Sequence, residues 1–297
     1  MHMTITANQV KELRERTGLG MMECKGALAE TRGDVNAAIE LLRKKAGSKV
    51  EKRAGRTAAD GAVGLYISPD RRLAALAEVN SETDFVSKGE DFLAFANAVA
   101  ARAAGAGPVD VAALAALPLR DGDVLTVAQA RENLIAQLGE NINVRRFARY
   151  AADDGHIGSY VHGRKIGVLV QLKGGDDQLA RDLAMHVAAS RPEYVTPDQV
   201  PAELVAKERE VYTAQAEQSG KPAAIVEKMV GGRITKFLSE VTLLGQPFVK
   251  NPEITVGQLL TQAGATVTRF CRFEVGEGIE KASADFASEV MAQVKGG

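Results

Sequence analysis

The side chains of this chain that could carry out chemistry do not form a familiar catalytic or metal-binding pattern. Of the four histidines, His156 and His162 stand six residues apart, at the two ends of an expected strand. This spacing puts both on one face of the strand but far from each other, so we expect them not to share a metal ion. His186 falls within a helical pattern, where a packed histidine is expected rather than a ligand.

Motifs for phosphate binding and hydrolysis are also missing from the sequence. Gly220-Lys221 is followed by Pro222, so the pair lacks both the hydroxyl and the upstream glycine of a phosphate-binding loop. The glycines at residues 17–20 are a fragment of a dinucleotide-binding pattern, and they follow a helix rather than a strand. No nucleophile elbow, HExxH helix or EF-hand loop occurs. We therefore expect a binding or regulatory protein that is no enzyme and has no metal and no cofactor.

One stretch nevertheless asks for an explanation, EVNSETDFVSKGEDF at residues 78–92. It places Phe85 among small polar residues, between a strand-like and a helix-like segment. SKGE fits a capping box, which would make Ser87 the N-cap of the helix that carries Phe92 and would leave Phe85 outside that helix. Phe85 could then fold back onto Phe92 or stay exposed for a partner, and the local pattern favours neither.

The composition describes an ordinary soluble protein. The chain has 297 residues, of which 45% are hydrophobic and 25% charged, and its formal net charge is −1. This length predicts two or three compact units. The chain has no basic excess, no apolar run of the roughly 18 residues that a membrane span needs, and no signal-peptide pattern. We expect a cytoplasmic protein that binds neither nucleic acid directly nor membranes.

The elements that must position these residues begin with three short helices at residues 1–45. A capping box at Thr6–Gln9 starts the first helix, a break at residues 17–20 ends it, and the second covers residues 21–31. The third helix has an apolar stripe at Val35, Ala38, Ile39 and Leu42. Residues 46–60, which follow it, are polar and basic, and we interpret them as a linker.

The rest of the chain contains a diverged duplication, at residues 61–151 and 152–275. GAVGLYI aligns with GHIGSYV, TVAQ with TVGQ, and RRFARY with TRFCRF. Each copy reads as hairpin, helix, helix and strand, which predicts a three-stranded antiparallel sheet with helices on one face and an α+β fold.

The copies differ where residues have been added. The second holds two helices at about residues 191–251, whose apolar seam predicts an antiparallel coiled-coil hairpin paired internally, with a second copy or with a partner. The first holds a small extra piece that contains Phe85, whereas the corresponding turn of the second, KGGDDQLA, has no aromatic residue. A helical module is expected at residues 276–297.

Several of these segments resemble one bacterial family, translation elongation factor Ts. LRERTGLGMMECKGAL at residues 13–28 and EVNSETDFVSK at residues 78–88 are similar to its two signature segments. SGKPAAIVEKMVGGRITKF, GQPFVKNP and RFEVGEGIEK are similar to its later parts, and only residues 106–123 have no confident match. The resemblance implies a ubiquitin-associated-like N-terminal domain, two related core subdomains, a coiled-coil protrusion and a C-terminal helix.

The resemblance also implies a function in protein biosynthesis. Such a protein binds elongation factor Tu carrying GDP and promotes guanine-nucleotide exchange to GTP by disturbing Mg²⁺ and nucleotide coordination in that partner. The element that enters near the partner's nucleotide site matches Thr83, Asp84, Phe85 and Val86. N-terminal positions that touch the partner's GTPase domain match Arg14, Met21 and Met22. A position facing another partner domain matches His162.

Other interpretations stay open at this point. Adjacent helical residues cannot both point into one seam, so one of Met21 and Met22 could pack in the core of its module, or both could face a partner. An adaptor that binds other helical surfaces through the N-terminal module is the alternative function, and an enzyme comes third. A homodimer, or a heterotetramer formed through the partner, is compatible with the sequence.

Overall fold

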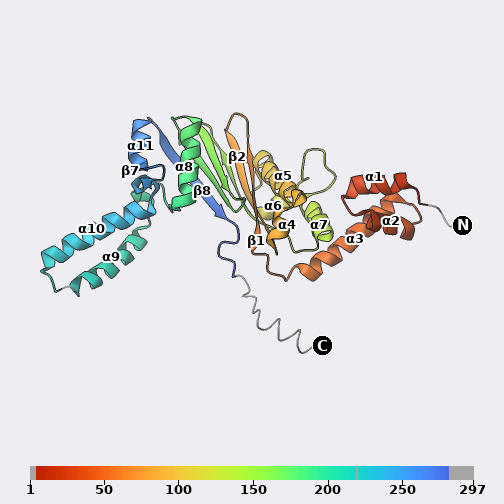
Figure 1. The fold of residues 1–297 in the computed structure, drawn as a ribbon, viewed down its shortest axis with the longest axis horizontal. Helices are drawn as coiled ribbons and strands as arrows, with labels where there is room; N and C mark the ends of the chain where they lie inside the picture. The colour runs from red at the N-terminus through yellow and green to blue at the C-terminus, as the bar shows by residue number, and fades with distance from the viewer. Residues whose placement is uncertain (1–4, 219, 281–297) are drawn as a thin grey trace, which may run out of the picture.

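The chain forms an elongated molecule with helical modules at its two ends and two small sheets between them (Figure 1). The computed structural model describes residues 5–218 and 220–280. The expected C-terminal module at residues 276–297 lies outside this range apart from its first five residues, 276–280.

The N-terminal module consists of three helices, as predicted. They are α1 (Ala7–Thr17), α2 (Met21–Glu30) and α3 (Val35–Arg53), and the capping box at Thr6 is present. The third helix does not end at residue 45, however, and it continues through the first half of the expected linker. Ala46 is buried and Val50, one turn later, packs against the core of the first sheet, so the helix has an apolar face there that the basic composition concealed.

The first sheet contains β1 (Asp60–Ile67), β2 (Leu73–Ser81) and β3 (Asn143–Ala151), all antiparallel and in that order. Its outer face is covered by α5 (Glu90–Ala106), with α6 (Val111–Ala116) and α7 (Val127–Leu138) beside it.

The second sheet repeats this plan with β4 (His156–His162), β5 (Ile166–Lys173) and β8 (Thr266–Glu274). Helix α8 (Asp177–Ser190) covers it, and α11 (Val256–Gln262) takes the place of α7. The register of each sheet shifts at the same point, between Glu78 and Val79 in one and between Gln171 and Leu172 in the other. The predicted α+β fold with two related three-stranded halves is confirmed.

A glycine at an equivalent position of each half lets the covering helix lie close to the first strand of its sheet. A Cβ atom on Gly64 would lie 2.1 Å from the carbonyl oxygen of Ala96 in α5, and one on Gly158 would lie 2.4 Å from that of Ala180 in α8. Both helices therefore approach their first strand more closely than any larger residue permits.

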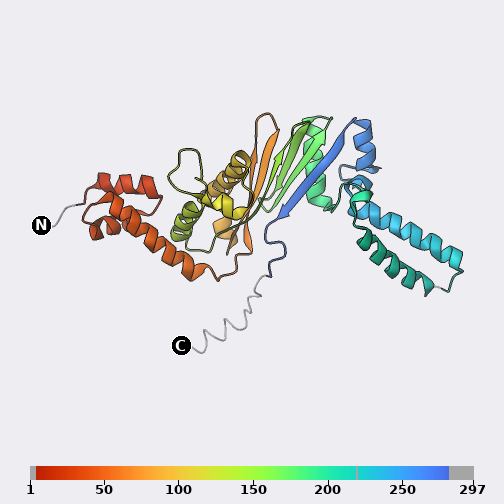
Figure 2. The same cartoon turned by 180° about the vertical axis from the view of Figure 1, so that it is seen from behind.

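The inner faces of the two sheets pack on each other, so the layers run α5, first sheet, second sheet, α8 in both views (Figure 1; Figure 2). This shared core explains why β2 and β5 are buried along nearly their whole length rather than alternately. Its largest members are Val63, Leu76, Tyr150, Ile157, Leu169 and Phe273.

The insertion in the second half forms the expected antiparallel hairpin, α9 (Ala202–Glu217) and α10 (Ala223–Val241). Its seam closes internally, because Val230 and Ile234 of α10 pack with Ala216 of α9. Short pieces connect it to the body, including β6 (Pro247–Phe248) and β7 (Asn251–Thr255). Within the described ranges, no helix combines the length and apolar character needed to cross a membrane.

Candidate functional site

The extra piece of the first half forms a short helix of its own, α4 (Asp84–Lys88), at the end of the first sheet (Figure 1). Thr83 is its N-cap, and the threonine hydroxyl accepts a hydrogen bond from the Val86 N–H. The predicted role of Ser87 as the cap of α5 is wrong. Ser87 already belongs to α4, where its buried hydroxyl contacts Asp60, and α5 begins after Gly89 without a side-chain cap.

Helix α4 directs Phe85 into solvent. The Phe85 side chain is 83% exposed, whereas Phe92 is completely buried in the first core. Val86, the next residue, turns inward and packs against that core. Of the two alternatives for Phe85, the structure therefore shows exposure and not packing on Phe92. Asp84 forms an ion pair with Lys88 on the surface of the same short helix.

A carboxylate beneath α4 fixes its C-terminal half. Asp60 accepts hydrogen bonds from the Ser87 hydroxyl at 3.1 Å and from the Gly61 N–H at 2.7 Å, and it forms an ion pair with Lys165. Burial alone would raise the pKa of Asp60, but Lys165 and these donors outweigh it and hold the pKa below its usual value. Because Lys165 comes from the second half, α4 rests on both halves of the molecule.

A second carboxylate, Glu78, is completely buried at the start of the signature stretch. Its oxygens accept hydrogen bonds from Arg145 at 3.0 Å, from Arg146 at 2.5 Å and from the Gly276 N–H at 2.9 Å. Burial alone would raise the pKa of Glu78, but the hydrogen bonds from Gly276, the two arginines and Asn80 together outweigh burial and hold the pKa below its usual value. Through these hydrogen bonds the Glu78 carboxylate connects β2 with β3 and with the segment that follows β8.

The N-terminal candidates lie on the surface of their module. Met21 and Met22 are 58% and 75% exposed, so of the two alternatives left open for them, the structure shows surface exposure of both rather than core packing of one. They occupy the first turn of α2, and the buried side of that helix starts at Cys24. Arg14 is exposed too, and it lines the same hollow of about 320 Å³ as Met21, beside the basic side chain of Lys25.

His162 ends β4 and is exposed. Its Nδ1 atom is 3.1 Å from the Tyr160 hydroxyl, a contact within its own strand. The turn that follows His162 reaches α4, since Arg164 donates a hydrogen bond to the Lys88 carbonyl at 3.5 Å. The structure thus brings this turn to the C-terminal end of α4, the helix that carries Phe85, while Arg14, Met21 and Met22 form a separate surface.

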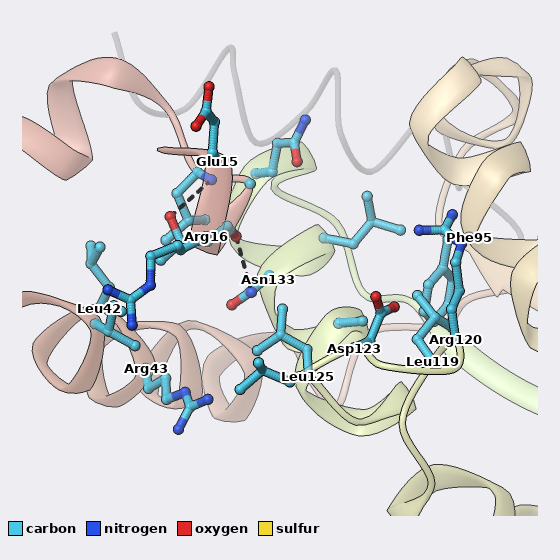
Figure 3. A pocket seen from close by; sticks show the side chains of 18 of the residues that line it. Glu15, Arg16, Leu42, Arg43, Phe95, Leu119, Arg120, Asp123, Leu125 and Asn133 are labelled. Atoms are coloured by element: carbon cyan, nitrogen blue, oxygen red, sulfur yellow. Dashed lines mark hydrogen bonds between the residues drawn. The ribbon is translucent and has the colours of Figure 1, made fainter. Parts of the chain in front are cut away.

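A second, larger hollow contains none of these candidates. It measures about 820 Å³ and lies between the N-terminal module and the first half, with Arg16 and Arg43 on one side and Arg120 and Asp123 on the other (Figure 3). Asn133 spans the junction by donating to the Thr17 carbonyl at 3.1 Å. In the described part of the chain, no three His, Cys, Asp or Glu residues are grouped as ligands for a metal ion.

Sequence reasoning missed the residues that hold the C-terminal half of α4, namely Asp60, Arg164 and Lys165. They belong to no motif, and their contacts join positions far apart in the chain.

Comparison with known proteins agrees with this architecture. A family model described as elongation factor TS matches residues 82–277. The chain is 59% identical over 293 residues to elongation factor Ts of Methylococcus capsulatus, with 99% of both chains covered. It is also 59% identical to elongation factor Ts of Thioalkalivibrio sulfidiphilus, with 99% of this chain and 100% of the relative covered. Helix α4 lies within the matched region and Asp60 precedes it, and the relatives extend the likeness to nearly the whole chain. The chain therefore belongs to the elongation factor Ts family.

Proposed function

We propose that this protein binds elongation factor Tu in its GDP-bound form and accelerates the exchange of GDP for GTP. The observation that carries the proposal is Phe85, a large aromatic side chain that stays 83% exposed although the helix beneath it is anchored on both halves of the molecule. A fold does not maintain such a side chain in water for its own stability, because burying it elsewhere would be favourable by about 2–3 kcal/mol.

In this mechanism, α4 enters the partner beside its nucleotide site. Phe85 takes the apolar contact, and Thr83, Asp84 and Val86 give the element its shape and charge. The Mg²⁺ of a GTPase bridges phosphate oxygens and neutralises their charge, so displacing its ligands weakens GDP binding. Each tenfold preference for the nucleotide-free partner corresponds to about 1.4 kcal/mol of coupling.

One phenylalanine supplies only part of a large acceleration, so a second contact surface is needed. Arg14, Met21 and Met22 supply it: the exposed methionines offer an adaptable apolar contact beside a basic hollow. His162 serves as a weaker contact with another domain of the partner. Because the protein acts through binding alone, it needs no catalytic site of its own, and we place it in the cytoplasm.

The experiment is the release of a fluorescent GDP analogue from purified elongation factor Tu, measured with and without this protein. We expect release to accelerate with its concentration and to saturate. Release at the same rate with and without the protein would refute the proposal. Light scattering of the mixture, in the absence of GDP, would distinguish a one-to-one complex from a heterotetramer.

A further inference from the structure

Two connections of the first half, between β2 and α5 and between α7 and β3, contain residues that the second half lacks. One is the connection between β2 and α5: residues 82–88 stand there, whereas only Gly174 and Gly175 separate β5 from the N-cap of α8. This longer connection contains α4 and Phe85.

The other added segment follows α7. Gly139 ends that helix with a left-handed φ of 81°, and Glu140 and Asn141 come between it and the buried Ile142. After α11, Gly264 is also left-handed, with a φ of 58°, but the buried Ala265 follows it directly. The strand registers support this alignment, because Asn143 pairs with Asn80 just as Thr266 pairs with Lys173. Glu140 and Asn141 are thus a second addition.

These two additions bind each other. The Thr83 N–H donates to Oε2 of Glu140 at 2.9 Å, and the Thr83 hydroxyl donates to Oε1 at 2.5 Å. In the opposite direction, the Asn141 N–H donates to Oε1 of Glu82 at 2.6 Å. The Asn141 amide group donates to the Arg56 carbonyl at 2.7 Å, which connects the two added segments to the turn that follows α3.

We infer that Glu140 is a positioning residue, which clamps the N-cap of α4 and so keeps Phe85 in the orientation that the partner recognises. The inference rests on the proposed function only for its effect on exchange. A helix of five residues has too few internal hydrogen bonds to be stable alone, so its direction depends on anchors at its ends. Asp60 anchors one end through Ser87, and Glu140 anchors the other through Thr83.

Loss of the Glu140 anchor should increase the conformational freedom of α4 in the free protein. When the N-terminal anchor is removed, α4 samples other orientations, and only a fraction of the molecules present Phe85 correctly before binding. The concentration needed for half-maximal stimulation rises by the reciprocal of that fraction, while the bound complex still reaches the same geometry. Loss of Glu140 should therefore raise the half-saturating concentration and leave the maximal release rate nearly unchanged.

The first test uses the free protein and amide hydrogen exchange. In Glu140→Ala, we expect the amides of residues 84–88 to exchange at least fivefold faster, and those of α5 to be unchanged. Glu140→Gln keeps an acceptor for the Thr83 N–H and can donate to the Thr83 hydroxyl, so it should restore protection to within twofold of wild type. Glu253→Ala, which removes the same charge from an exposed residue of β7, is the matched control and should change nothing.

The second test is stimulated GDP release with the same three variants. For Glu140→Ala, we expect a five- to tenfold higher half-saturating concentration and a maximal rate within twofold of wild type. Glu140→Gln and Glu253→Ala should behave like wild type. Unchanged amide exchange in Glu140→Ala, an unchanged half-saturating concentration, or a Gln variant as impaired as the Ala variant would overturn the inference. If the wild-type protein itself fails to stimulate release, the proposed function fails, and the hydrogen-exchange result still decides whether Glu140 holds α4.

Discussion

Replacing Phe85 with alanine separates the contribution of its ring to nucleotide exchange from any contribution to folding. In the free protein the ring packs on nothing that the fold needs, since the side chain is 83% exposed and Val86 provides the inward contact of α4. We expect the free energy of unfolding to change by no more than about 0.5 kcal/mol, as for other surface substitutions.

The effect on exchange should be much larger. Complete burial of a phenylalanine side chain contributes about 2–3 kcal/mol, and an exposed ring has nearly all of that gain still available. Since each 1.4 kcal/mol corresponds to about a tenfold change in affinity, removing the ring should weaken binding of the transition state for GDP release by at most roughly 30- to 150-fold. We therefore expect Phe85→Ala to lower the stimulated release rate between about tenfold and 100-fold.

The assay is stopped-flow release of fluorescent GDP from elongation factor Tu over a range of variant concentrations, together with urea unfolding of the free variant. Val124→Ala is the control, since Val124 is 86% exposed and lies far along the chain from α4. It should leave both measurements unchanged. A Phe85→Ala protein that stimulates release as well as wild type, or that loses several kcal/mol of stability, would show that the reasoning is wrong.

Three further predictions follow from the described contacts. Glu78→Gln should lower the free energy of unfolding at pH 7 by about 2–4 kcal/mol, because Arg145 and Arg146 lose a buried partner. Since the pKa of Glu78 is depressed in the fold, its stabilisation is present above about pH 4.3 and is lost as the pH falls through the folded pKa, so wild type but not Glu78→Gln should show this loss in urea titrations. Arg14→Ala combined with Met21→Ala should raise the half-saturating concentration for GDP release without changing protein stability, and an unchanged value would remove the N-terminal surface from the proposal. Burial raises the pKa of the Cys24 thiol and raises that of Cys271 to about 11, so neither should react with a thiol reagent at pH 8 until urea unfolds the chain, as absorbance of the released product would report.

The sequence predicted the fold well because its signals there are local and repeated. Capping boxes at Thr126 and Thr255 start equivalent helices, and each hairpin has its alternation and its turn within about 20 residues. Two copies of one pattern support each other, so an error in either would have been visible. The packing of the two sheets on each other was not predicted, because burial on a second face leaves no separate periodicity in strands that are already apolar.

The candidate site was predicted less completely. The resemblance proposes residues 83–86 as the site, but it does not indicate Asp60 and Glu140, which contact α4 and its N-cap from distant parts of the chain. The prediction that Ser87 caps α5 was wrong because its spacing fits a capping box, whereas its buried hydroxyl donates a hydrogen bond to Asp60. The length difference after α7 was the one available signal for Glu140, and it becomes interpretable only when the two halves are aligned by their left-handed glycines.

The helical hairpin joins the body in a way that allows its length to change without affecting the sheets. Its entry and exit are hydrogen-bonded neighbours: the Leu243 N–H donates to the Tyr194 carbonyl at 2.8 Å, and the Leu244 N–H donates to the Val195 carbonyl at 3.1 Å. Because the two ends already meet, lengthening or shortening α9 and α10 in step would leave the register of β5 and β8 untouched. The reach of this arm can therefore vary between related proteins, or be redesigned, independently of the sheets and of α4.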